Sequence, residues 1–258
     1  MDVIEIRIKS ALVRSKIPGV DYVINPYLGC GHGCRYCYAV FMRKYSHHPN
    51  SPWGSFVEAK TNIAKVLHSE LHRKRRQGRA LLSSVCDPYQ PLEHRYHLTR
   101  ACLEVLRNWG WGIEILTRSP LVTRDLDILA ATAGVSVGFS IPTDDDEVRK
   151  VLEPHAPPIG ARLSALSKLH EAGIATWVFI APILPMNPTR LYEAIAPYIT
   201  YLMVDSLNYR NQVKDIFLKQ HWEYELSDQY AAETRAILMG QWEKRERRTE
   251  ARNTDREK

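Results

Sequence analysis

Residues 25–38 have the sequence Asn25-Pro-Tyr-Leu-Gly-Cys30-Gly-His-Gly-Cys34-Arg-Tyr-Cys37-Tyr38. Three cysteines stand here at the spacing C-x3-C-x2-C, directly after an apolar segment that we predict to be a strand. Three thiolates suit a soft metal or an iron–sulfur cluster. Gly29, Gly31 and Gly33 permit unusual backbone angles. This segment is therefore predicted to be a loop that winds around a bound group, and the interpretation of the fold starts from it.

The loop offers only three sulfur ligands. A structural zinc site usually has four protein ligands, and ordinary [4Fe–4S] clusters take four cysteines. The next cysteine in the chain is Cys86, and His32 stands between two cysteines that must turn around the same metal. We interpret the loop as the ligand set of a [4Fe–4S] cluster, Cys30, Cys34 and Cys37, with one iron open to a chelating small molecule. The alternative is a zinc site or three incidental core cysteines.

Composition limits the class of protein. The chain has 258 residues, of which 45% are hydrophobic and 25% charged. This usage is typical of a globular domain and not of a disordered chain, a collagen-like repeat or a disulfide scaffold. No apolar run approaches the ~20 residues of a membrane-spanning helix, and the first 16 residues show no signal-peptide pattern. We expect a cytoplasmic protein without a membrane partner. The net charge of +6 favours an anionic partner only weakly.

Short apolar runs alternate with segments of helical periodicity. The predicted strands are Tyr22–Asn25, Ala80–Cys86, Gly112–Thr117, Val135–Ile141, Ala175–Ala181 and Tyr201–Ser206. The predicted helices between them are Thr61–Arg76, Leu98–Trp109, Leu121–Ala133, Ala161–Ala172 and Thr189–Tyr198. Alternation of this kind implies parallel strands joined by right-handed crossovers.

Six such units predict an α/β fold, an incomplete (β/α)6 TIM-type barrel with parallel strands, because a full barrel has eight. An open doubly wound sheet is the competing architecture. A last helix is expected at about Glu223–Glu243. The charged segment 244–258 contains no strongly apolar run and is expected to be frayed helix or disorder. We expect one domain over residues 1–243, followed by this polar tail.

The cysteine motif, with Tyr36 before its last cysteine, resembles the cluster loop of radical S-adenosylmethionine (SAM) enzymes. Three further segments, SSVCDPYQPLE, SIPTDDDEVRKVLEPHAPPIGARLSALSKLHEAGI and APILPMNP, resemble the spore photoproduct lyase-like branch, often described as DNA repair photolyase-like. The similarity covers roughly residues 20–210. These segments are good markers of the branch and poor markers of the substrate.

The resemblance implies two cofactors, a [4Fe–4S] cluster and S-adenosylmethionine. It implies that the open iron is chelated by S-adenosylmethionine, whose reductive cleavage gives a 5′-deoxyadenosyl radical that abstracts hydrogen from a substrate. An electron donor such as flavodoxin or ferredoxin is the implied partner. The substrate is unidentified. A DNA lesion is one candidate, and RNA, a peptide or a small molecule are others.

Four residues are expected to contact the cofactor. The resemblance places Tyr36 beside the cluster, Ser140 near the ribose or methionine part, and Arg162 within reach of the cofactor carboxylate. Asp87 follows the second strand, at the strand ends where parallel α/β folds build their sites. The alternatives are a helix-capping serine, a solvated helix arginine and turn chemistry at Asp87.

Cys86 is the candidate catalytic residue. Spore photoproduct lyases carry a hydrogen-donating cysteine near this strand end, and a thiol can quench a carbon radical. The alternative is a small buried hydrophobe. Three further hypotheses concern residues near the loop. Glu153 orients Arg149 or Arg162, Arg118 meets an anionic substrate, and Tyr38 and Phe41 help to exclude water from the cluster. A non-catalytic zinc or iron–sulfur protein is the rival function.

Overall fold

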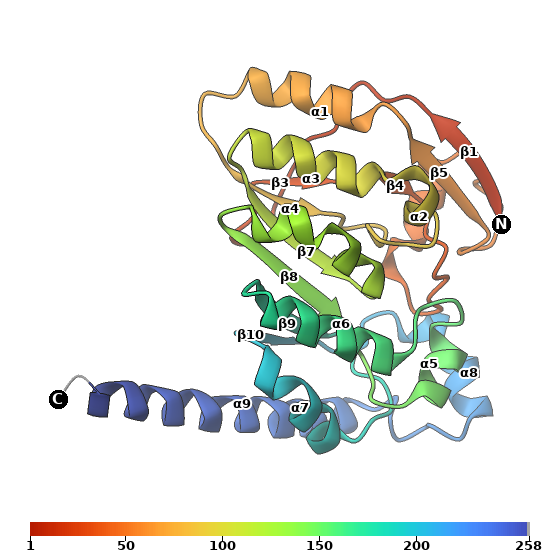
Figure 1. Ribbon diagram of the computed structural model, residues 1–258. Helices are drawn as coiled ribbons and strands as arrows, with labels where there is room; N and C mark the ends of the chain where they lie inside the picture. Colours follow the sequence, from red (N-terminus) through yellow and green to blue (C-terminus); the bar gives the residue numbers. More distant parts are fainter. Residues whose placement is uncertain (257–258) are drawn as a thin grey trace.

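The computed structural model describes the backbone of residues 1–256 and the side chains of residues 1–250. Its central element is a seven-stranded sheet (Figure 1). The parallel strands of this sheet are β3 (Tyr22–Ile24), β6 (Arg79–Leu82), β7 (Gly112–Thr117), β8 (Val135–Ser140), β9 (Ala175–Ile180) and β10 (Tyr201–Val204). Each coincides with a strand predicted from the sequence, so the expected α/β fold with a parallel sheet is confirmed.

Strand β6 ends earlier than predicted. The prediction continued it to Cys86, whereas residues 83–86 form a loop. Ser83 has a φ of 70°, in the left-handed region, which interrupts the strand. The Asn25 carboxamide oxygen then accepts hydrogen bonds from Ser83 Oγ and from the Ser84 backbone N–H, both at 3.0 Å. The first residue of the cysteine motif thereby shapes the loop after β6.

The strands lie in the order β10-β9-β8-β7-β6-β3-β2, where β2 (Val13–Arg14) is antiparallel to β3. The parallel strands follow one another in chain order, without the reversal that defines a doubly wound sheet. The doubly wound alternative is therefore wrong. Right-handed crossovers between successive neighbours place their helices on one face, and Figure 1 shows α3, α4 and α6 in front of the strands.

The predicted helices are present with shifted ends. They are α1 (Ile63–His72), α3 (Leu98–Asn108), α4 (Leu126–Ala130), α6 (Ile159–Glu171) and α7 (Pro188–Ile195). The predicted helix 121–133 is divided into a 3₁₀ helix, η2 (Pro120–Asp125), and α4. The predicted helix 189–198 is likewise divided into α7 and a 3₁₀ helix, η3 (Ala196–Tyr198). Further short helices, which the sequence did not predict, are η1 (Tyr38–Tyr45), α2 (Glu93–Tyr96), α5 (Asp146–Leu152), η4 (Arg210–Gln212) and α8 (Lys214–Lys219).

A second, three-stranded sheet was not predicted. Strand β5 (Phe56–Lys60) lies between β1 (Asp2–Ile6), which is parallel to it, and β4 (Tyr27–Leu28), which is antiparallel. Two residues are too few to show a strand periodicity, so β4 was invisible in the sequence. Because β4 leads directly into the cysteine loop, this small sheet ties the loop to the N-terminus.

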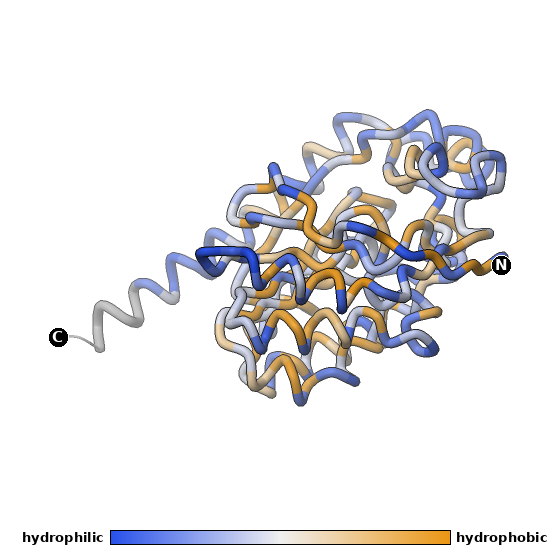
Figure 2. Tube along the Cα trace, turned by 90° about the horizontal axis from the view of Figure 1, so that it is seen from above, coloured by the Kyte–Doolittle hydropathy of each residue, from blue (hydrophilic) through white to orange (hydrophobic). Residues whose placement is uncertain are grey.

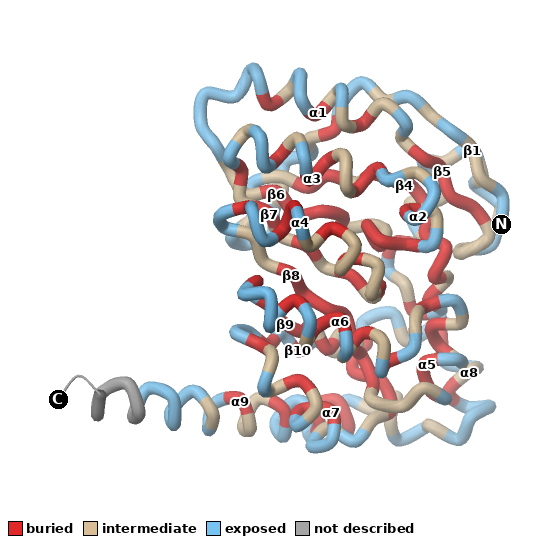
Figure 3. Tube along the Cα trace, viewed as in Figure 1, coloured by how far each residue is buried: buried red, intermediate tan, exposed pale blue. Residues whose placement is uncertain are grey.

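The main core lies between the parallel sheet and its helices. Alternate strand residues point to it, as β-strand geometry requires, and Leu82, Ile115, Val137 and Val178 are fully or almost fully buried there. Figure 3 shows buried residues along the strands and the inner sides of the helices, and Figure 2 shows apolar residues in the same interior.

The last helix, α9 (Asp228–Arg256), corrects two expectations. It begins at Asp228, later than predicted. It also continues to residue 256, through the segment that was expected to be frayed helix or disorder. The last two residues of that segment lie outside the described part of the chain. Glu, Lys and Arg are strong helix formers, and pairs four residues apart stabilise an exposed helix. Arg247 and Glu243 form such a pair at 3.9 Å.

Helix α9 also covers the edge of the parallel sheet. Arg235 donates to the Val204 carbonyl at 2.7 Å and Arg245 to the Ile199 carbonyl at 3.0 Å. These bonds satisfy one backbone acceptor at the end of β10, the edge strand, and one just before it, where unpaired groups would otherwise invite another strand. Among the described helices, none is long and apolar enough to cross a membrane.

Candidate active site

The cysteine loop, residues 29–38, follows β4 at the C-terminal end of the parallel sheet. Cys30 and Cys34 are buried, Cys37 is half-buried, and none of the three is in a disulfide. Gly29 has a φ of 83°, and a Cβ there would lie 2.5 Å from the Phe56 carbonyl oxygen. Glycine is therefore required at this position by both backbone conformation and space.

A loop from the second sheet closes over the cysteine loop at Gly33. A Cβ on Gly54 would lie 2.6 Å from the Gly33 Cα atom, and both glycines have positive φ angles. Two side-chain-free residues thus allow two backbones to touch. This contact brings residues 53–55 beside Gly33 and Cys34, which sequence analysis did not foresee.

Gln90 holds the two backbone groups that flank Cys30. Its Oε1 accepts from the Gly31 N–H at 2.9 Å, and its Nε2 donates to the Gly29 carbonyl at 3.3 Å. The Gln90 side chain is fully buried. Buried backbone groups without partners are costly, so this amide fixes the course of the loop around its first ligand.

Glu93 holds the segment that leads into the loop. It accepts from the Tyr27 hydroxyl at 2.5 Å, from the Thr99 N–H at 2.9 Å and from Arg124 at 2.8 Å. Burial, with the neighbouring Glu93 carboxylate, raises the pKa of Tyr27 far above its usual range. Tyr27 therefore stays a hydrogen-bond donor. The side chains of Gln90 and Glu93 thus support the cysteine loop at its first ligand and at the segment before it.

Asp87 contacts the loop through His32. Its carboxylate lies 3.3 Å from His32 Nε2 and accepts from Thr117 Oγ1 at 2.6 Å and from the Arg118 N–H at 2.7 Å. Burial alone would raise the pKa of Asp87, but His32, Thr117 and the backbone donor hold it at about 2. The other ring nitrogen of His32 lies 3.4 Å from the His155 carbonyl oxygen. In this conformation both ring nitrogens face protein groups, and Nε2 lies at ion-pair distance from Asp87 but has no hydrogen-bond partner among the described residues.

A buried ionic network lies on the other side of the loop, centred on Glu153. Its carboxylate accepts from the Tyr36 hydroxyl, from Arg162 and, at 2.8 Å, from Arg118 Nε. Burial would raise the pKa of Glu153, but the two guanidinium groups and Tyr36 lower it to about 2. The sequence hypothesis that Glu153 orients Arg162 fits this geometry. Arg118, expected to meet an anionic substrate, is paired with Glu153 and is only partly exposed.

The network gathers three of the four predicted cofactor contacts. Tyr36 and Arg162 bind the same carboxylate, and Arg162 also donates to the Ser140 carbonyl at 2.9 Å. The Ser140 hydroxyl oxygen is buried and has no hydrogen-bond partner among the described residues. Such an orphan is rare in folded proteins and suits a bound group. Asp87, the fourth, lies with His32 beside Cys30 instead.

Cys86 lies against the segment before the loop. Its sulfur is 2.8 Å from Ser83 Oγ and 3.4 Å from the Tyr27 carbonyl oxygen. It is partly buried against the main core, and burial raises the pKa of its thiol to about 11. Cys86 is therefore a protonated thiol close to Cys30, rather than a thiolate.

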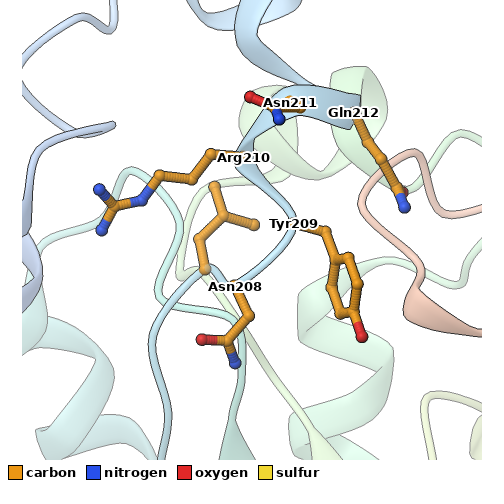
Figure 4. A pocket seen from close by; sticks show the side chains of 6 residues that line it. Asn208, Tyr209, Arg210, Asn211 and Gln212 are labelled. Carbon is orange, nitrogen blue, oxygen red and sulfur yellow. The ribbon is translucent and has the colours of Figure 1, made fainter.

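Two cavities open beside the loop. The larger, of about 820 Å³, is lined by Gly31, Gly33 and Cys34 of the loop and by residues of other segments. The smaller, of about 400 Å³, is formed by residues 207–212 after β10 (Figure 4), and Gln212 lines both. Ser140, Arg162, Asp87 and Cys86 line neither of these cavities.

The donor set fits an iron–sulfur cluster. The thiols are free and mostly buried, and burial raises the pKa of Cys34 to about 12, so binding a metal must release protons. Among the described residues, no three His, Cys, Asp or Glu side chains meet at a point that could hold a single ion. A [4Fe–4S] cluster takes one cysteine per iron, and its ligands need not meet at one point.

Comparison with known proteins identifies the family. The sequence profile of the radical SAM superfamily matches residues 24–196. The chain belongs to this superfamily. Radical SAM proteins use a [4Fe–4S] cluster and S-adenosylmethionine, which establishes both as the cofactors here.

The chain is also similar to an individual protein sequence and to solved structures. An uncharacterised protein of Methanocaldococcus jannaschii, MJ0683, is 34% identical over 210 residues, 81% of this chain and 78% of its own. A mutant of spore photoproduct lyase, solved with AdoMet and a dinucleoside spore photoproduct, has a TM-score of 0.59 at 17% identity over 84% of this chain. Streptococcus suis SuiB, solved with its precursor peptide SuiA, has a TM-score of 0.52 at 15% identity over 77%. The chain matches 66% and 46% of those two chains, and at these identities the likeness shows the fold alone.

The role of Gln90 gives a first prediction. Replacing Gln90 by leucine keeps the volume but leaves the Gly31 N–H and the Gly29 carbonyl without partners, which costs about 1–3 kcal/mol. We expect hydrogen exchange of the Gly31 amide to accelerate on the order of tenfold, with less iron retained per chain. Gln220→Leu, on the exposed end of α8, is the matched control. Exchange as slow as in the parent protein would contradict the role.

Proposed function

We propose that the protein cleaves S-adenosylmethionine reductively and abstracts hydrogen from a substrate. Cys30, Cys34 and Cys37 would each hold one iron of a [4Fe–4S] cluster. The observation that carries this proposal is a loop with three free, mostly buried thiols, whose own histidine, His32, is turned toward Asp87 and the His155 carbonyl. When bound, the cluster and S-adenosylmethionine supply an electron and a 5′-deoxyadenosyl radical.

The chain's own residues position and shield these groups. Ser140 offers an unpaired hydroxyl, and we assign it to the nucleoside or methionine part of the cofactor. Arg162 and Tyr36 share Glu153, so in our proposal they set the shape and the charge of the wall behind Cys34. Asp87, through His32, holds the Cys30 side of the loop. We also propose that the parallel sheet is a six-unit partial barrel and that residues 1–243 form one domain. The free thiols fit a cytoplasmic location.

Two substrate classes have support from the neighbours. A DNA lesion is the first candidate, because the motifs and the fold resemble spore photoproduct lyase, which was solved with a dinucleoside photoproduct. A peptide is the second, because SuiB was solved with a precursor peptide. RNA and small molecules are further candidate substrates of the same reaction. The alternative function is that of a non-catalytic zinc or iron–sulfur protein.

One experiment tests the function directly. Anaerobic reconstitution is expected to give about four irons per chain and absorption near ~400 nm. Reduction in the presence of S-adenosylmethionine should then release 5′-deoxyadenosine, and deuterated candidate substrates should label it. Stoichiometric zinc without deoxyadenosine would instead favour the non-catalytic protein.

We further propose Cys86 as a hydrogen-atom donor to a substrate radical. Its thiol is protonated at neutral pH because burial raises its pKa to about 11. We expect Cys86→Ala to leave iron content unchanged but to alter the deuterium content and the by-products of the reaction once a substrate is known. Cys102→Ala, in the main core, is the matched control. An unchanged product distribution would refute this role.

A further inference from the structure

A line of exposed side chains begins one residue after the third cysteine. In a 3₁₀ helix, residues three apart lie in line, and in η1 this places Tyr38, Phe41 and Lys44 on one ridge. Tyr38 is 45% exposed and Phe41 46%, with ring centroids 6.5 Å apart, and Lys44 is exposed as well. We call these three residues, with Tyr45 beside them at 71% exposure, the η1 ridge.

The expected role of these aromatic rings was to exclude water from the cluster. Rings that are nearly half exposed do this poorly, so that hypothesis does not fit Tyr38 and Phe41. Neighbouring exposed aromatic residues are instead typical of surfaces that a partner covers. The Tyr38 hydroxyl donates to the Ser84 carbonyl, which fixes the start of the ridge against the loop after β6.

The ridge lies in a positively charged segment. No Asp or Glu occurs between Asp21 and Glu58, while Arg35, Arg43 and Lys44 fall in this stretch. Two carboxylates lie beside histidines that follow η1: Asp2 is 3.4 Å from His48, and Glu58 is 3.2 Å from His47. Three others that contact this stretch, Asp87, Glu93 and Glu153, are buried and hydrogen-bonded inside the protein. Arg35 and Lys44 are both exposed on this stretch, and such cations suit an acidic partner.

The same segment carries the cluster ligands. Cys37, which directly precedes η1, is the one thiol of the three that is only half-buried. Val40 of η1 does not belong to the ridge. It lines the larger cavity together with Cys34 and Arg35. The ridge is therefore the solvent side of a short helix whose other side reaches the cysteine ligands, which makes it a short route from the surface to the cluster.

We propose that the η1 ridge is the docking surface for an acidic one-electron carrier protein, of the flavodoxin or ferredoxin class, that reduces the cluster. This inference rests on the function proposed above. One electron leaves the reduced carrier and enters the oxidised cluster, and no bond or proton changes place in this step. Small interfaces with complementary charge are typical of such transient contacts.

Aromatic rings with cations can also bind single-stranded nucleic acid. Such binding depends on many phosphate contacts, whereas the ridge and its surroundings offer three cations within residues 35–44. The small patch directly beside a cluster ligand favours the electron carrier. Binding of nucleic acid is an outcome that the test below detects.

The test follows bleaching of the reconstituted cluster near ~400 nm in a stopped-flow instrument under anaerobic conditions. Reduced flavodoxin is one donor and dithionite, which needs no docking surface, is the other. For the double variant Phe41→Ala/Lys44→Glu, we expect the second-order rate constant with flavodoxin to fall about tenfold or more, with a weaker dependence on salt. Reduction by dithionite and the iron content should not change. Lys65→Glu, an exposed residue of α1, makes the same charge change elsewhere.

The outcomes separate the two proposals. An unchanged flavodoxin rate in the double variant, or parent protein that dithionite reduces but flavodoxin does not, would overturn the docking surface alone. A dodecamer of thymidylate that slows flavodoxin with the parent protein would reassign the ridge to nucleic acid. Absence of bleaching with dithionite, or of deoxyadenosine afterwards, would count against the proposed function itself.

Discussion

Replacing Cys34 by alanine is expected to abolish both cluster retention and cleavage of S-adenosylmethionine. The loop has three thiols and its histidine faces Asp87, so the loop itself holds no fourth thiol that could replace Cys34. Anaerobically reconstituted protein should fall from about four irons per chain to fewer than about one. Release of 5′-deoxyadenosine should fall at least about 100-fold, as expected when a metal site is lost.

The matched control is Cys102→Ala. Cys102 is fully buried on α3 in the main core, away from the loop, and is not a proposed ligand. This variant should bind iron and form deoxyadenosine like the parent chain. Iron and colour retained in Cys34→Ala would show that another group supplies the third ligand, and the assignment of the loop would then be wrong.

The second large effect is expected at Glu153. Glutamine in its place has the same shape but removes the charge that compensates the guanidinium groups of Arg118 and Arg162. Arg162 is fully buried, and breaking a buried ion pair from one side typically costs 3–5 kcal/mol. Because Arg118 is partly exposed, we expect a loss of roughly 3 kcal/mol in the free energy of unfolding, measured by urea denaturation.

The loss of stability in Glu153→Gln should become smaller at acidic pH. The pKa of Glu153 lies at about 2 in the folded protein, below its usual value of 4.5. A lowered pKa contributes stability above the unfolded-state pKa, and this contribution disappears as the pH falls through the folded-state value. The difference in the free energy of unfolding between the parent protein and Glu153→Gln should therefore be fully present near neutral pH and become smaller below about pH 4.5.

Glu147→Gln is the control for this prediction. Glu147 pairs with Lys150 at 2.6 Å on the exposed surface of α5, where ion pairs contribute about 0–1 kcal/mol. Equal losses in the two variants would mean that Glu153 acts as an ordinary surface charge, contrary to its position in the network.

Several elements were visible in the sequence because their signals are local. The strands of the parallel sheet are apolar runs bounded by turns, and helices such as α3 place Leu98, Cys102 and Leu106 on one buried face. The missed elements carry no such signal. Strand β4 has two residues, and β1 acquires its partner β5 from 54 positions away, Asp2 pairing with Phe56. Between residues 243 and 250 the described side chains of α9 are mostly exposed, so the sequence there shows no apolar face that would distinguish helix from disorder.

The sequence by itself determined the chemistry of the protein. The spacing of Cys30, Cys34 and Cys37 is local, and three thiols within eight residues of one loop restrict what can bind there whatever surrounds them. The tertiary structure alone decided what holds that loop. Gln90 meets Gly31 across 59 residues, Glu93 meets Tyr27 across 66, and Glu153 meets Tyr36 across 117. A buried polar group takes whichever partner the fold brings within hydrogen-bond distance, and distances across the sheet are not encoded in the spacing of residues along the chain.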